Sequence, residues 1–184
     1  MKKIIIKLKY LSLFTTFFFM IFISVLLMNR QGYSIVRDPI SAIGNLTENF
    51  PIFFLGSAIT FLLFTYVVYK IYQRDEIKVG WEVFSVPILG ISSVLVPFRD
   101  HLPILKNVHN LLVILSAVVI LRMIAIYNKK IKYKRKYHYF SRHIPEIGFF
   151  GTLILYLLTG LNTIIELFYI VIIFYWINYV TYND

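Results

Sequence analysis

The chain has 184 residues, of which 59% are hydrophobic, 18% are aromatic and only 15% are charged. This composition excludes an ordinary water-soluble domain and indicates a membrane protein. The absence of cysteine excludes disulfides, thiolate metal sites and thiol nucleophiles. The net charge of +10 does not call for a nucleic-acid partner, because basic loops beside a membrane are attracted to anionic lipid.

Six apolar stretches predict an all-α, polytopic membrane protein that forms a single domain over residues 1–184. Most of the stretches approach the length of about 20 residues that a helix needs to cross a hydrocarbon core. The predicted transmembrane helices cover residues 11–28, 51–69, 81–96, 103–127, 147–158 and 163–180.

Two of these stretches need separate comment. The first follows the basic segment MKKIIIKLKY, as in a signal peptide, but it is longer than a usual signal core and no cleavage site follows it. We therefore expect a retained helix. The third stretch is the weakest, because it contains Pro87, Gly90, Ser92 and Ser93. These residues indicate a helix that is bent or closely packed against its neighbours.

The distribution of positive charge predicts the orientation of the chain in the membrane. Four of the nineteen Lys and Arg residues (Arg30, Arg37, Arg99 and Lys106) follow odd-numbered helices, and the other fifteen lie on the side of the N-terminus. Because basic segments stay in the cytoplasm, both termini are predicted to be cytoplasmic in a multi-pass protein of the cell membrane. The basic loop over residues 128–143 is predicted to contact anionic lipid.

Two similar stretches place polar residues on the predicted outer side. They are VRDPISAIGN (residues 36–45) and FRDHLPILKNVHN (residues 98–110), and the turn before the last helix lies on the same side. Polar groups that are far apart in the sequence are thus expected to gather at one membrane face. The predicted ligand-binding residues are Arg37, Asp38, Ser41, Arg99, His109, Asn110 and Glu166.

Glu166 is the most informative of these residues because it lies in the apolar helical stretch NTIIELFYIVIIFYW. A charged side chain costs up to about 2.5–3.5 kcal/mol at the centre of a membrane helix, so it usually faces a partner inside the bundle. Glu166 is therefore interpreted either as a structural partner of Arg37 or Arg99 or as a functional carboxylate. His109 has the same two interpretations, a hydrogen-bonded packing residue or a ligand.

Catalysis and metal binding are the alternatives at this site. Asp100, His109 and Glu166 are the candidate catalytic residues, either as general acid and base or as metal ligands. Together with His101 they form a set of nitrogen and oxygen donors that suits zinc or another divalent metal. The sequence has no HxxxH or HExxH pair, so we predict no cofactor. Ser41 lacks the GxSxG context of a serine nucleophile and is expected to cap a short helix.

The arrangement resembles a family of prokaryotic integral membrane proteins that contain domain of unknown function 998. The resemblance rests on the DPISAIG segment with Ser41 and Gly44, on His109, on Glu166 and on the aromatic ending FYWINY. It extends distantly to six-helix proteins that include damage-regulated autophagy modulators and GPI-anchor remodelling proteins. The resemblance implies a six-helix membrane fold without an established activity, with relatives linked to lipid remodelling. The chain lacks the paired histidines of alkaline ceramidases, which argues against a zinc amidase mechanism.

Three functions follow from these observations. The first is an uncharacterised, non-enzymatic membrane protein whose outer polar pocket binds a lipid head group or a membrane partner, with Arg37 and Arg99 holding phosphate or carboxylate. The second is a membrane-embedded lipid hydrolase or transferase that uses the His and carboxylate site. The third is an accessory subunit of a larger membrane complex, for which we expect a solid core without a cavity.

Overall fold

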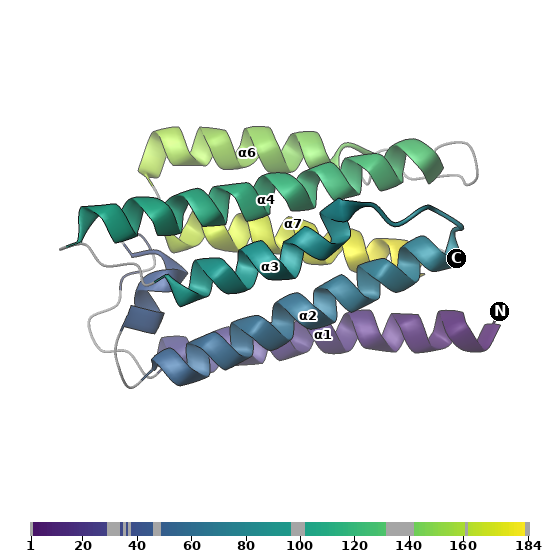
Figure 1. The fold of residues 1–184 in the computed structure, drawn as a ribbon, viewed down its shortest axis with the longest axis horizontal. Helices are drawn as coiled ribbons and strands as arrows, with labels where there is room; N and C mark the ends of the chain where they lie inside the picture. The colour runs from purple at the N-terminus through teal and green to yellow at the C-terminus, as the bar shows by residue number, and fades with distance from the viewer. Residues whose placement is uncertain are drawn as a thin grey trace.

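The regular secondary structure in the described part of the chain consists of helices alone. The structure is a computed structural model that describes residues 2–28, 34, 36, 38–45, 49–96, 102–131, 142–160 and 162–182. Its elements are α1 (Lys2–Met28), the short 3-10 helix η1 (Ile40–Asn45), α2 (Phe50–Arg74), α3 (Trp81–Leu95), α4 (Pro103–Ile131), α6 (Ile144–Thr159) and α7 (Thr163–Tyr182) (Figure 1). The predicted all-α class is confirmed for these residues.

Four of the helices are long and apolar enough to cross a membrane, namely Lys7–Met28 within α1, α2, α4 and α7. The other two, α3 and α6, have 15 and 16 residues. At about 1.5 Å per residue they are shorter than a hydrocarbon core of roughly 30 Å. Four of the six predicted spans therefore have the required length, and the spanning of α3 and α6 stays a prediction.

The helices are arranged as a ring in chain order. Each of α1, α2, α3, α4 and α6 contacts the next helix, and α7 closes the ring by packing against α1 while it also contacts α2. The hydroxyls of Ser12 in α1 and Thr181 in α7 lie 2.8 Å apart at this closure, although 169 positions separate them in the sequence. Both termini lie at one end of the bundle, called the terminal end below, and η1 lies at the opposite end (Figure 1).

The inner helix faces are closely packed. A Cβ atom placed on Gly90 of α3 would lie 2.5 Å from the ring of Phe61 in α2, and one placed on Gly56 of α2 would overlap the ring of Phe22 in α1. Glycine at these positions lets the helix backbones approach each other. The expectation of close packing around Gly90 is confirmed.

The outer faces carry large apolar side chains on every long helix and on both short ones. Exposed examples are Phe17 in α1, Leu62 in α2, Ile88 in α3, Ile114 in α4, Leu157 in α6 and Val171 in α7. An apolar surface that surrounds the bundle would be unfavourable in water, whereas the acyl chains of a bilayer solvate it. The described architecture is thus that of an integral membrane protein.

Candidate functional site: a cavity with one polar end

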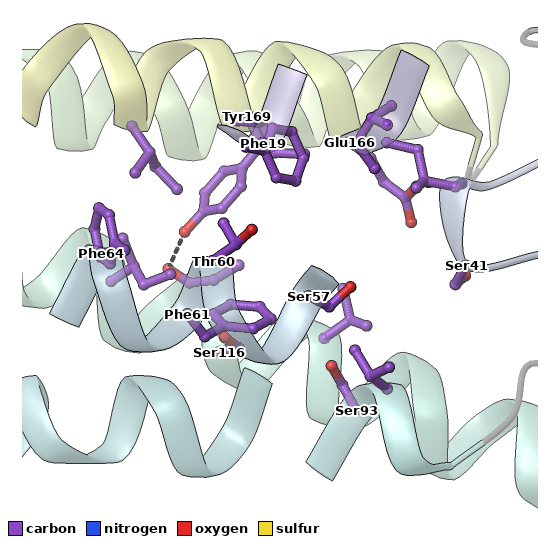
Figure 2. A pocket seen from close by; sticks show the side chains of 18 of the residues that line it. Phe19, Ser41, Ser57, Thr60, Phe61, Phe64, Ser93, Ser116, Glu166 and Tyr169 are labelled. Atoms are coloured by element: carbon purple, nitrogen blue, oxygen red, sulfur yellow. Dashed lines mark hydrogen bonds between the residues drawn. The ribbon is translucent and has the colours of Figure 1, made fainter. Parts of the chain in front are cut away.

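A cavity of about 200 Å³ lies inside the ring, between η1, α1, α2, α3, α4 and α7. Most of its wall is aromatic or aliphatic, including Phe19, Phe61 and Phe64 (Figure 2). The polar side chains that line it are Ser41, Ser57, Thr60, Ser93, His109, Ser116, Glu166 and Tyr169. The cavity therefore combines a large apolar surface with a small set of polar groups, as ligand sites in proteins commonly do.

Glu166 is positioned by a segment that crosses the start of α7. The backbone N–H of Ile40 donates a hydrogen bond to the Glu166 carboxylate at 2.5 Å. Two residues earlier, the carbonyl oxygen of Asp38 accepts hydrogen bonds from the N–H of Thr163 at 3.0 Å and from its hydroxyl at 2.6 Å. The side chain of Asn162 caps α7 by accepting the N–H of Ile165 at 3.2 Å. These contacts hold η1 and the first turn of α7 together.

The described partner of Glu166 is thus a backbone amide. One carboxylate oxygen accepts the Ile40 N–H, and no other hydrogen bond or ion pair of this side chain is found in the described part of the chain. The predicted pairing with Arg37 or Arg99 involves residues that lie outside the described part, so it stays a prediction. Within that part, Glu166 carries the single carboxylate of the cavity wall.

Ser41 lies within η1 and faces the same end of the cavity as Glu166 (Figure 2). Its side chain is buried, and its hydroxyl oxygen has no hydrogen-bond partner among the described residues. The predicted capping role for Ser41 is wrong, because η1 begins before it and the hydroxyl satisfies no backbone group. A buried hydroxyl without a partner is costly, so Ser41 is able to form a hydrogen bond with a polar group that enters the cavity.

His109 lines the cavity from α4. Its ring is 3% exposed, and Nδ1 lies 2.8 Å from the carbonyl oxygen of Val96, just beyond α3. Because a carbonyl oxygen only accepts hydrogen bonds, Nδ1 must carry a proton and donate it. This bond fixes the orientation of the imidazole and ties α4 to the end of α3.

Three further hydroxyls in the cavity wall donate to the backbone. Thr60 donates to the carbonyl oxygen of Gly56 at 2.8 Å, Ser93 donates to that of Gly90 at 2.7 Å, and Tyr169 donates to that of Ala117 at 2.7 Å. A hydroxyl has a single hydrogen, so each of these oxygens can offer only lone pairs to anything inside the cavity.

The structure thus brings three predicted site residues, Ser41, His109 and Glu166, to one cavity. Asp38 and Asn110 are close in sequence to Ser41 and His109, but neither of them lines the cavity. The remaining candidates, Arg37, Arg99, Asp100 and His101, lie outside the described residues, and the catalytic and metal predictions that use them stay untested. Among the described residues, no three His, Asp or Glu side chains are close enough together to hold a metal ion.

Sequence reasoning missed the hydroxyls of the wall. Ser57 and Thr60 are three positions apart on α2, a spacing that places both on one helix face. This spacing of small polar residues in an apolar helix was the available signal. It is a weak signal, because Ser and Thr are common at helix contacts in membranes.

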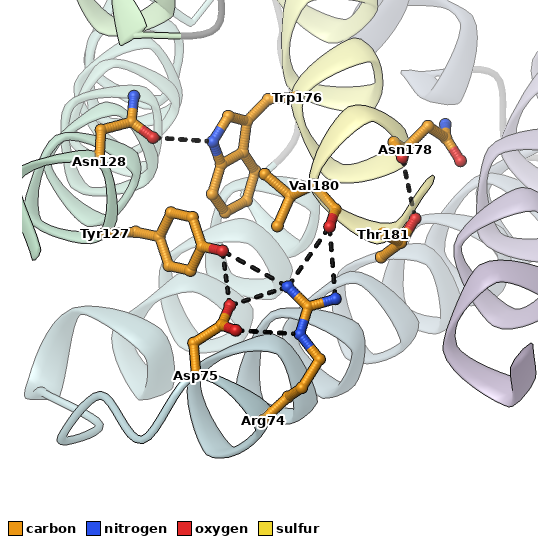
Figure 3. A network of polar contacts seen from close by, with 8 residues as sticks. All are labelled: Arg74, Asp75, Tyr127, Asn128, Trp176, Asn178, Val180 and Thr181. Atoms are coloured by element: carbon orange, nitrogen blue, oxygen red, sulfur yellow. Dashed lines mark hydrogen bonds and ion pairs between the residues drawn. The ribbon is translucent and has the colours of Figure 1, made fainter. Parts of the chain in front are cut away.

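Sequence reasoning also missed a polar cluster at the terminal end, where α2, α4 and α7 meet (Figure 3). We call Arg74, Asp75, Tyr127 and the carbonyl of Val180 the terminal-end cluster. Nη2 of Arg74 lies 2.8 Å from Oδ2 of Asp75, the Tyr127 hydroxyl donates to the same oxygen at 2.6 Å, and Arg74 donates to the Val180 carbonyl at 3.3 Å. The Arg74 and Asp75 side chains are 7% and 2% exposed. The cluster therefore fastens three helices from within.

The function is inferred from this geometry, because the comparisons with known proteins do not identify it. The resemblance seen in Ser41, Gly44, His109 and Glu166 accordingly stays a prediction. Comparison of the chain with protein-family models, with curated proteins and with solved structures found no match.

Proposed function

We propose that the chain is a multi-pass membrane protein that binds a single-chain amphiphile, such as a lipid with one acyl or alkyl chain, in its interior cavity. The observation that carries the proposal is the division of the cavity wall. Ser41, Ser57 and Glu166 lie toward the η1 end, whereas Phe61 and Phe64 surround the deeper part (Figure 2). The hydroxyls of Thr60 and Tyr169 also lie in the deeper part, but both already donate to backbone carbonyls, so a ligand with a polar head and an apolar tail complements both parts at once (Figure 2).

The size of the cavity supports a small ligand. Its volume of about 200 Å³ lies below the range of roughly 300–1,000 Å³ that is usual for drug-sized ligands. A phospholipid with two chains is far larger than this space. The cavity instead suits one short chain, or the head group and first carbons of a longer chain.

The charge distribution supports an orientation for this site. At the terminal end the described residues include Lys9, Lys70, Lys78, Lys129 and Lys130. By the tendency of positive charge to remain in the cytoplasm, the terminal end is cytoplasmic and the polar end of the cavity faces outward. The basic loop over residues 128–143 is then available to anionic lipid of the inner leaflet.

The alternative functions have less support. An accessory subunit was expected to have a solid core, whereas a cavity lies between the described helices, lined by a buried hydroxyl that has no partner among the described residues. A hydrolase or transferase would need a carboxylate or metal ligand beside His109 and Glu166, and Asp100 is the candidate for that role. We therefore take binding as the function and keep catalysis as an extension of it.

The proposal is tested by filling the cavity. Ala117 on α4 lines the cavity, and Ala125 lies two turns further along the same helix, exposed on its outer face. Ala117→Phe should place a ring in the space that the ligand needs, whereas Ala125→Phe adds the same ring outside. Wild-type protein and both variants would be extracted from membranes directly into nanodiscs, and bound amphiphile would be measured by native mass spectrometry.

We expect wild-type protein and Ala125→Phe to retain an amphiphile at one copy per chain, and Ala117→Phe to lose it. Equal retention by the two variants would contradict binding in this cavity. The absence of any retained amphiphile from wild-type protein, together with no uptake from added lipid, would contradict the proposed function altogether.

A further inference from the structure

We propose that the ligand of this cavity carries a primary ammonium as its head group, so that the site selects single-chain amines over fatty alcohols and fatty acids. The inference rests on the proposed function, because it concerns the chemistry of the same site. Three features of the wall support it: the direction of its hydrogen bonds, the single hydrogen bond of the Glu166 carboxylate, and the absence of Lys and Arg among the described residues that line the cavity.

The direction of the hydrogen bonds makes the wall rich in acceptors. The hydroxyl hydrogens of Thr60, Ser93 and Tyr169 are already donated to backbone carbonyls, as is the Nδ1 proton of His109. What the first three side chains offer to a ligand is therefore lone pairs. A head group that only accepts hydrogen bonds, such as a carboxylate, could draw on the hydroxyls of Ser41, Ser57 and Ser116 alone among the described wall hydroxyls, whereas an ammonium provides three donors and can use every oxygen of the wall.

The Glu166 carboxyl adds an acidic group to this pattern, and an ammonium beside it would favour its ionised form. One oxygen accepts the Ile40 N–H, and the other has no partner in the described part of the chain. A buried carboxylate is costly unless it is paired and hydrogen-bonded. An ammonium that enters the cavity would supply the missing hydrogen bond and the opposite charge together.

The described part of the wall contains no basic side chain that would pair with Glu166. Among the described residues that line the cavity, none is Lys or Arg. Ser41, whose buried hydroxyl has no described partner, lies at the same end as Glu166 and can accept from an ammonium while its own hydrogen is free to donate to another group. A phosphate or carboxylate head would instead face the Glu166 carboxyl, and no described residue of the wall offers a cation to offset the repulsion.

Octylammonium, octanol and octanoate test this inference, because they share one chain and differ in the head group. Each would be titrated into wild-type protein in nanodiscs, with Ala117→Phe in nanodiscs as the reference for partition into lipid. We expect octylammonium to bind at least tenfold more tightly than octanoate, with octanol between them. A charge-assisted hydrogen bond is worth about a factor of ten or more.

Two variants test whether residues of the cavity wall cause the preference for the ammonium head group. Glu166→Gln retains an acceptor for the Ile40 N–H but removes the charge, and it should weaken octylammonium about tenfold while it changes octanol less than threefold. Thr60→Val keeps the shape of the side chain and removes one acceptor, and it should weaken octylammonium a few-fold. This second variant keeps the test decisive if Glu166→Gln does not fold.

The outcomes separate the two proposals. Equal binding of all three probes, or tightest binding of octanoate, would overturn the ammonium selection and leave cavity binding intact. Octylammonium binding that Glu166→Gln and Thr60→Val both leave unchanged would also overturn it. No binding of any probe above the Ala117→Phe reference would overturn cavity binding itself.

Discussion

Replacement of Tyr127 by Phe in the terminal-end cluster is a direct test of how the helices are fastened together. The change removes one oxygen and leaves the ring, which packs edge-on against Trp176 with 5.4 Å between the ring centroids. The lost group is the hydroxyl that donates to Oδ2 of Asp75 at 2.6 Å. Since the Asp75 side chain is 2% exposed, water cannot readily replace the lost bond.

The expected cost follows from two reference values. Hydrogen bonds to charged groups contribute about 1.5–3 kcal/mol, whereas bonds between membrane helices average about 0.6 kcal/mol. Asp75 keeps Arg74 as a partner at 2.8 Å after the change, which limits the loss. We therefore expect Tyr127→Phe to lower the free energy of unfolding by about 1.5 kcal/mol, roughly a tenfold change in the unfolding constant.

The measurement is equilibrium unfolding by SDS in mixed micelles, followed by tryptophan fluorescence and circular dichroism. Tyr156→Phe is the matched control, because Tyr156 is 52% exposed on α6. The control should change the free energy by less than about 0.5 kcal/mol. A double-mutant cycle with Asp75→Asn isolates the contact. A loss for Tyr127→Phe no larger than that of the control, or a coupling energy near zero, would refute the reasoning.

The other predictions concern the short helices and the cap of α7. Because the chain contains no cysteine, Lys78→Cys and Leu102→Cys, which flank α3, can be labelled without a background, and an impermeant thiol reagent should reach them from opposite sides of the membrane. Glu146→Cys and Thr159→Cys make the same test for α6, and labelling of both members of a pair from one side would show that the helix does not span. Asn162→Ala should lower the free energy of unfolding by about 1 kcal/mol through loss of the N-cap, whereas Asn162→Ser should retain most of it; equal losses would contradict the capping role.

Helices were predictable from the sequence because apolar stretches of this length have few alternatives in a membrane. Their ends were less predictable. The second helix was expected to end at residue 69, and α2 continues to Arg74; the fourth was expected to end at residue 127, and α4 continues to Ile131. Hydropathy marks where the apolar stretch ends, whereas Lys, Gln and Arg are good helix formers that extend the helix beyond it.

The polar residues of the site were only partly predictable. Glu166 and His109 were noticeable because ionisable side chains are rare in apolar helices. Thr60 and Ser93 were not, because a hydroxyl that bonds a carbonyl one turn earlier is satisfied within its own helix, at 2.8 Å and 2.7 Å here. The burial of Asp75 depends on where α4 and α7 pack, which the local sequence does not encode.

The closure of the ring by α7 also determines when the cavity can exist. Synthesis delivers the helices from the N-terminus onward, so α1 to α6 enter the membrane before the helix that joins the two edges of the ring. Until α7 arrives, Ser12 lacks its partner Thr181, and the future cavity is a groove open to the bilayer on one side. If the proposed function holds, an amphiphile in the bilayer would enter this groove sideways, and docking of α7 would then complete the wall around it. The protein would thus acquire its first ligand as a step of its own assembly.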